Sequence, residues 1–328
     1  MAPMFANLPR IDRLVKLRNA IAELVVAPEC GARLVAFRVA GRDILRPATQ
    51  AALDSAFVYG FAAFPLMPYS GPIFGGGFRF NGQWYPMDRN VPTEPTATHG
   101  EAWIRPWTIV SESDTKLDLS LDYTPIAGAF PFAWCGEITY GLDQGSFVID
   151  LKLTNRDHRP IPAGIGFHPY FPKAPGSVLT FDCTGVWPPD APEAVNQGCG
   201  PVEAALDFRH GQDISAMIFD RCFEGWDGCA TLSTADGVTT RIEAGANFGK
   251  LQIYDAWDYP YICIEPVSNA NDGFNRAAGG VPGSAVAILE PGRSLAERIT
   301  ITPLRDGGPL KGDETASLEL ASVHTVTR

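Results

Sequence analysis

Apolar and polar residues alternate with a period of two along most of this chain, and Gly, Pro, Asn and Asp interrupt the alternation at short intervals. This pattern is typical of short strands joined by turns. The clearest runs lie at residues 22–27, 32–40, 117–123, 137–142 and 146–155. We therefore predict a protein that is built from many short antiparallel strands.

Three segments predict pairs of strands joined by a tight turn, at residues 78–87, 231–244 and 288–302. The first contains Asn81-Gly82, a pair that supplies the two positive-φ residues of a type I′ hairpin turn. The second turns at an Asp-Gly pair and the third at a Pro-Gly pair. Helical patterns are scarce, since residues 201–208 form at most one short helix.

Frequent turns between short strands favour a β-sandwich or a barrel over alternating βαβ units. The 33 glycines and 28 prolines fit a loop-rich β protein, and no fixed-period repeat or charged linker divides the chain. The alternation fades after Leu304 into a polar, glycine-containing segment. We predict a single β domain over residues 1–304 and a C-terminal tail over residues 305–328.

Charge and cysteine content narrow the possible partners. The chain has 26 basic and 37 acidic residues, a net charge of −11, which disfavours nucleic acid and anionic membranes because both attract positive surfaces. No apolar stretch is long enough for a membrane span, and the first residues lack the apolar run of a signal peptide. The seven cysteines are widely spaced without a C-x-x-C motif, which argues against disulfides and zinc knuckles. We expect a cytoplasmic protein that binds a small neutral ligand.

Two of the five histidines lie in segments with distinctive chemistry. His168 lies in the apolar run GIGFHPYF, and Pro169 restricts its backbone to an extended conformation. It is either a hydrogen-bonded core histidine or a half-buried imidazole suited to acid–base catalysis. His99 precedes Gly100 in a loop and is either an ordinary surface residue or, with Trp103 close by, part of a sugar site.

Two carboxylates follow apolar residues. Glu265 comes directly after YICI, so either the strand has reached solvent or a buried base has its pKa raised by desolvation. Asp220 follows Ile218 and Phe219, and it either caps a turn or accepts hydrogen bonds from sugar hydroxyls. The residues alone leave both alternatives open.

In their order along the chain, these segments resemble the aldose 1-epimerase (galactose mutarotase) family. The similarity covers residues 20–304, and HPYF and IEP are its most specific parts. The segments that carry it are CGARLVAF (30–37), GFRFNGQWYPMDRN (77–90), THGEAW (98–103), GIGFHPYF (164–171), FDRCFEGWDG (219–228), LQIYDAW (251–257), YICIEPVSNANDGFN (261–275) and LEPGRSL (289–295).

The resemblance implies a galactose mutarotase-like β-supersandwich with an open sugar cleft, no cofactor and no metal. By position in the motifs, Glu265 is the general base and His168 the general acid. The sugar-binding residues implied by the same motifs are His99 and Asp220, with Gln252 and Tyr254 as possible additions.

One segment departs from the family pattern. Family members often carry Asn-Arg-Ile before the hairpin, with the arginine on the sugar, whereas this chain has Gly71 and Pro72 there. Proline supplies neither a charge nor a donor. The sugar therefore differs from galactose or glucose, or catalysis has weakened or changed on a retained fold.

The leading hypothesis is an isomerase that interconverts the anomers of a free aldose by acid–base ring opening. One alternative is a non-catalytic carbohydrate-binding or regulatory protein on the same fold. Another is a glycoside hydrolase or lyase that uses Glu265 and Asp220 as a carboxylate pair, or an epimerase or lyase that acts on an atypical sugar. A sugar phosphate would need a basic anion site. The sequence leaves the identity of the sugar and the oligomeric state open.

Overall fold

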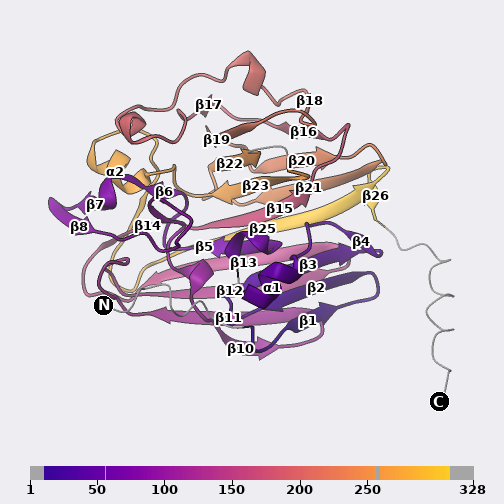
Figure 1. The fold of residues 1–328 in the computed structure, drawn as a ribbon, viewed down its shortest axis with the longest axis horizontal. Coiled ribbons are helices and arrows are strands. Elements are labelled where there is room, and N and C mark those ends of the chain that lie inside the picture. Colours follow the sequence, from indigo (N-terminus) through magenta and orange to yellow (C-terminus); the bar gives the residue numbers. More distant parts are fainter. Residues whose placement is uncertain (1–10, 56, 256–258, 311–328) are drawn as a thin grey trace.

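Two large antiparallel sheets form the protein in the computed structural model, which describes residues 11–310 except 56 and 256–258 (Figure 1). The first sheet has the order β1-β2-β3-β5-β15-β23-β22-β19-β17, with β4 on β3. Its strands are β1 Val15–Arg18, β2 Ala22–Ala27, β3 Arg33–Val39, β4 Arg42–Asp43, β5 Ala63–Leu66, β15 Gly166–Pro172, β17 Gly185–Val186, β19 Phe219–Glu224, β22 Lys250–Asp255 and β23 Tyr261–Val267.

The second sheet has the order β10-β11-β12-β13-β25-β21-β20-β16-β18, with β26 on β25. Its strands are β10 Thr108–Glu112, β11 Lys116–Tyr123, β12 Trp134–Asp143, β13 Ser146–Asn155, β16 Val178–Phe181, β18 Gln212–Asp213, β20 Cys229–Ser233, β21 Val238–Ala244, β25 Ser294–Arg305 and β26 Gly308–Pro309. Alternate residues of β11 and β13 are buried, as the period-two pattern predicts. The fold is therefore all-β, as expected.

Three two-stranded sheets and short helices complete the structure. The pairs are β6 Pro72–Ile73 with β9 Ala97–Thr98, β7 Gly77–Phe80 with β8 Gln83–Pro86, and β14 Ile161–Ala163 with β24 Ala287–Leu289. The helices are α1 Gln50–Ser55, α2 Gly273–Ala278 and the 3₁₀ turns Val58–Gly60, Phe74–Gly76, Ala102–Ile104, Pro192–Ala194 and Ala204–Leu206. Neither α-helix, nor any other helix of the described residues, has the length and apolar character of a membrane span.

Two of the three predicted hairpins are confirmed and one is wrong. Asn81 and Gly82 have φ values of 49° and 78°, as a type I′ turn requires. Strands β20 and β21 pair around the Asp-Gly turn. The runs on either side of the Pro-Gly turn do not pair with each other, because β24 pairs with β14 and β25 lies between β13 and β21.

The core lies between the two large sheets. Phe37 on β3 contacts Phe147 on β13 with a centroid distance of 5.4 Å, and Phe167 on β15 contacts the ring of Tyr140 on β12. All seven cysteines are free, in agreement with the sequence analysis. Strand β26 extends the second sheet beyond residue 304, and residues 311–328 of the expected tail lie outside the described residues.

Strand β15 is buried on both faces, so its sequence is a continuous apolar run instead of an alternation. Phe167 points into the core between the sheets. His168 points the other way, where Phe64 on β5 and the segment that contains Trp103 cover the sheet. The face of the first sheet that carries His168, which points away from the second sheet, therefore has room for a cavity beneath the covering segment.

The turn between β2 and β3 holds this covering segment in place. Gly31 has a φ of +73°, and a Cβ atom there would lie 2.0 Å from the carbonyl oxygen of Trp103. Arg33 Nε donates a hydrogen bond to the same oxygen at 2.9 Å. The close approach of the two backbones therefore requires glycine at position 31.

We predict that Gly31→Ala destabilises the fold more than Gly41→Ala does. Gly41 has a similar φ of +77°, but no atom lies within 4 Å of the position that a Cβ would take there, so its substitution costs only the left-handed backbone penalty of about 1–2 kcal/mol. At Gly31 the Trp103 backbone must also move, which adds roughly 1 kcal/mol or more. Urea denaturation measures both values, and equal losses would show that the contact is unimportant.

Candidate active site

A cavity of about 820 Å³ opens on the face of the first sheet that points away from the second sheet. Its floor is formed by side chains from β15, β19, β22 and β23, and its walls include residues from 46–51, 57–60, 70–74 and 93–99. All six residues that the sequence analysis selected line this cavity: His99, His168, Asp220, Gln252, Tyr254 and Glu265. The fold thus gathers into one place residues that lie up to 166 positions apart.

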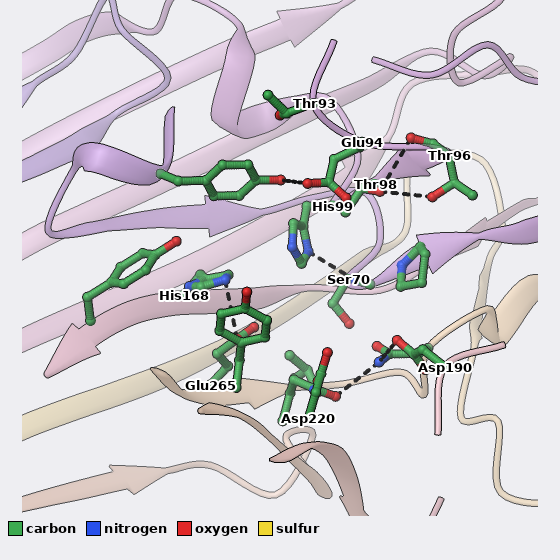
Figure 2. Close-up of a pocket in the computed structure, with 18 of the residues that line it drawn as sticks. Ser70, Thr93, Glu94, Thr96, Thr98, His99, His168, Asp190, Asp220 and Glu265 are labelled. Atoms are coloured by element: carbon green, nitrogen blue, oxygen red, sulfur yellow. Dashed lines mark hydrogen bonds and ion pairs between the residues drawn. The ribbon is translucent and has the colours of Figure 1, made fainter. Parts of the chain in front are cut away.

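The centre of the cavity floor is a histidine–glutamate pair. Strands β15 and β23 are antiparallel neighbours, and their register, with Gly166 opposite Val267, sets His168 across from Glu265. Nε2 of His168 lies 3.3 Å from Oε1 of Glu265, and the two side chains are 6% and 2% exposed (Figure 2). Glu265 is therefore not at a strand end that reaches solvent but in the buried interior of β23.

Aromatic rings fix the orientation of His168. Its imidazole packs against the rings of Phe64 and Tyr170, with centroid distances of 4.5 and 4.8 Å. The ring of His99 stands perpendicular to it at 5.3 Å. These contacts leave the imidazole little freedom to rotate, and they keep Nε2 directed at Glu265.

His99 lies in the connection after β9 with a left-handed backbone (φ 60°). Its Nδ1 accepts a hydrogen bond from the Gly71 N–H at 3.1 Å. Burial lowers the pKa of His99 to about 3, so the ring is neutral at physiological pH. A neutral imidazole that accepts at Nδ1 carries its proton on Nε2, which makes His99 a hydrogen-bond donor towards a ligand.

A chain of amides joins two further carboxylates at the lower edge of the cavity in Figure 2. Gln252 on β22 donates from Nε2 to Oδ1 of Asp220, and its Oε1 accepts from Nδ2 of Asn271 at 3.0 Å. Asn271 Nδ2 also donates to Oδ2 of Asp190 at 2.7 Å. Sequence reasoning missed Asp190 and Asn271, because both lie in loops whose Asp and Asn residues are ordinary turn formers.

The electrostatics of the cavity disfavour charge on every group of the floor. Burial, followed by the charges of Asp220 and Asp190, raises the pKa of Glu265 well above its usual value. Burial and the neighbouring His99 lower the pKa of His168 well below its usual value. Burial, followed by Asp190, raises the pKa of Asp220 to about 7, and burial raises the pKa of Asp190 to about 6. Such perturbed groups in one cavity are typical of functional sites.

One set of side chains in the described structure has the donor atoms of a metal site. The ligand atoms of His168, Cys263 and Glu265 lie within 4.8 Å of one another. Burial, followed by Glu265, raises the pKa of the Cys263 thiol well above its usual value, which keeps the sulfur protonated. Metals bind the thiolate, so a metal ion would have to displace this proton, and function without a metal or cofactor stays our prediction.

Comparison with known proteins identifies related chains. The profile of the aldose 1-epimerase family matches residues 13–302. The uncharacterised protein YphB of Escherichia coli K12 is 25% identical over 248 residues, which cover 73% of this chain and 83% of YphB.

Solved structures share the fold. A galactose mutarotase-like protein from Clostridium acetobutylicum superimposes with a TM-score of 0.77 at 17% identity, covering 89% of this chain and 95% of that one. Galactose 1-epimerase from Lactobacillus acidophilus gives a TM-score of 0.70 at 16% identity, over 89% and 94% of the two chains. At these identities the likeness shows the fold alone.

The raised pKa of Asp220 predicts a pH-dependent contribution to stability. Its folded value of about 7 exceeds the ordinary 3.8, so between these values the folded protein binds a proton that the unfolded chain has released. This stabilisation is present at low pH, and it is lost as pH rises towards the folded pKa. We expect the free energy of unfolding of the wild type, minus that of Asp220→Asn, to fall between pH values of about 4 and 7 in urea denaturation.

The matched control is Asp143→Asn, at an exposed position on β12. Its difference from the wild type should not show this trend. A difference for Asp220→Asn that is constant with pH would show that Asp220 titrates alike in the folded and unfolded chains.

Proposed function

The chain belongs to the aldose 1-epimerase family, and we propose that it interconverts the α and β anomers of a free aldose within the cavity. The observation that carries this proposal is the buried pair of His168 and Glu265, whose Nε2 and Oε1 atoms lie 3.3 Å apart. Mutarotation needs one proton acceptor and one proton donor that reach the same sugar ring. The pair supplies both.

The proposed reaction begins with the ring-form sugar, after a proton has passed from Glu265 to His168 across the 3.3 Å between Oε1 and Nε2, so that Glu265 is ionised and His168 protonated. Glu265 takes the proton from the hydroxyl on C1, and His168 gives a proton to the ring oxygen as the bond between C1 and that oxygen breaks. The product is the open-chain aldehyde. After rotation about the C1–C2 bond, the ring oxygen attacks the other face of C1, and both protons return to their original positions.

The environment of the pair supports this sequence of proton transfers. In the open-chain complex, Glu265 is protonated and His168 is neutral. Burial favours this same neutral arrangement, since it raises the pKa of Glu265 and lowers that of His168. Burial thus favours the open-chain complex over the charged pair, and the free energy needed to form the charged pair is part of the barrier to ring opening.

The other residues have binding roles in the proposal. Neutral His99 donates to a sugar oxygen, and Asp220 accepts from a sugar hydroxyl while Gln252 holds its carboxylate. Tyr254 on β22 lies opposite Asp220 in the strand register and contributes an aromatic wall. The apolar faces of pyranose rings pack well on such rings.

We predict that Glu265→Gln and His168→Asn each lower kcat for anomer exchange by about 10²–10⁴-fold, the usual contribution of a positioned proton-transfer group. The measurement is polarimetry or NMR of freshly dissolved pure anomers. Thermal unfolding of each variant verifies that the fold is retained.

Matched control substitutions are Glu203→Gln and His210→Asn, at exposed positions that are not among the residues lining the cavity. Both should keep wild-type rates. If folded Glu265→Gln and His168→Asn proteins exchanged anomers as fast as the wild type, the assignment would be wrong. Calorimetric sugar binding without any exchange in the wild type would favour a carbohydrate-binding protein instead.

A further inference from the structure

We propose that the cavity selects aldoses that carry a protonated amino group and discriminates against anionic sugars, with Asp190 as the residue that determines this selectivity. The inference rests on the proposed function and specifies the substrate class of the same site. It follows from the charges of the cavity, from the way in which Asp190 is held, and from the space around Asn271.

Carboxyl groups outnumber cationic groups in the described lining of the cavity. Its ionisable carboxyl groups belong to Glu94, Asp190, Asp220 and Glu265, and its one guanidinium belongs to Arg46. Two of these five groups, Glu94 and Arg46, have partners other than the amides and the histidine of the floor. Tyr59 donates its hydroxyl hydrogen to Glu94, and Arg46 donates to the carbonyl oxygens of Tyr59 and Phe61.

The head group of Arg46 is also covered by aromatic rings. Its Cζ lies 4.2 Å from the ring centroid of Tyr170 and 4.5 Å from that of Tyr261. Cation–π contacts on both rings and two carbonyl partners hold the guanidinium where it is. Arg46 is therefore poorly placed to cross the cavity and neutralise Asp190 or Asp220.

The two arginines that act on these aspartates electrostatically donate their hydrogen bonds to main-chain carbonyl oxygens. Arg276 donates to the carbonyl oxygens of Asn271, Ala194 and Gln197. Arg221 donates to the carbonyl oxygen of Asp220, not to its carboxylate. Each moderates the charge of the aspartates from a distance, but neither pairs with a carboxylate oxygen of Asp190 or Asp220 in the described structure.

Asp190 has a fixed orientation towards the ligand space. Asn271 is 6% exposed and donates its two amide hydrogens to Asp190 and Gln252. Gln252 in turn donates to Asp220, so one rigid chain of amides joins the two carboxylates. The amide bonds engage Oδ2 of Asp190 and Oδ1 of Asp220, which leaves the second oxygen of each carboxylate for a donor on the ligand.

The wall beside Asn271 cannot supply a cation either. A Cβ atom on Gly71 would lie 2.1 Å from Oδ1 of Asn271, so the amide occupies the space that a side chain at position 71 would need. The next residue of the wall, Pro72, has no polar side-chain atom. Asn271 thus excludes a side chain from this wall while it holds Asp190 in place.

The result is a site in which neither Asp190 nor Asp220 has a paired cation among the described residues. After burial, Asp190 is the next cause of the raised pKa of Asp220, and both aspartates add to the raised pKa of Glu265, as expected of carboxyl groups in a common cavity. An ammonium group donates three hydrogen bonds and carries the charge that relieves this repulsion. A phosphate, sulfonate or carboxylate on the sugar would increase the repulsion.

The test compares isosteric sugars in which one hydroxyl is replaced by an amine. Pure anomers of glucose and of its 2-amino, 3-amino and 6-amino analogues are assayed by NMR at a pH at which the amines are protonated, with glucuronate as the anionic member. We expect kcat/KM for at least one amino analogue to exceed that for glucose by about tenfold, as a charge-assisted hydrogen bond replaces a neutral one. We expect glucuronate to fall below glucose.

Asp190→Asn should reduce the ratio between the amino analogue and glucose towards one, whereas Asp143→Asn should preserve it. Thermal unfolding verifies the fold of both variants. The comparison of amino, neutral and anionic sugars on the wild type tests the inference even if a variant does not fold. The inference is overturned if no amino analogue surpasses glucose, or if the preference persists in folded Asp190→Asn.

Calorimetry separates this inference from the proposed function. If no sugar shows accelerated anomer exchange, the mutarotase proposal fails, and the ratio of dissociation constants for the amino analogue and glucose still decides the charge preference. If glucose exchanges rapidly but amino analogues bind and react no better, the mutarotase proposal survives and the charge preference does not.

Discussion

Burial of one histidine–glutamate pair between two central strands is the constraint on which the site depends. An unpaired carboxylate inside a protein is strongly unfavourable, so Glu265 must have a partner, a proton or both. His168, directly across the sheet, provides the partner, and the aromatic rings of Phe64 and Tyr170 fix its position. The covering segment that contributes His99 helps to bury the pair, and burial is the largest cause of both pKa shifts.

The sequence predicted the strands better than their partners. Alternation marks a strand wherever one face is buried, so β2, β3, β11 and β13 were found from local pattern alone. Which strands pair in a sheet depends on segments that are distant in the sequence and lie next to each other only in the folded protein. The Pro-Gly turn at residues 291–292 suggested a hairpin, but β24 pairs with β14 and β25 with β13 and β21, since a turn residue fixes the chain direction and not the neighbour.

The same limit applies to the site. Glu265 and His168 were recognisable because each is a polar residue inside an apolar run, and such a residue needs a special explanation. Asp190 and Asn271 lie in loops, where Asp and Asn are common and carry no local signal. Their importance arises from contacts across 81 positions, through the hydrogen bond from Asn271 Nδ2 to Asp190 Oδ2. A single sequence contains no pattern that reports such a contact.

The acidic floor and the catalytic pair are parts of one electrostatic arrangement. Each carboxylate beside Glu265 increases the proton affinity of that residue, and this favours the neutral pair in which the sugar is open. A ligand that brings a positive charge next to Asp190 and Asp220 would ionise them and add two negative charges near Glu265. The positive charge of the ligand offsets the two negative charges of the aspartates, so the proton affinity of Glu265 stays within the range that catalysis needs. On this reasoning, the charge of the substrate and the pKa of Glu265 are coupled through Asp220. Gln252 on β22 lies opposite Glu265, and Asp220 lies on β19, the next strand of the sheet.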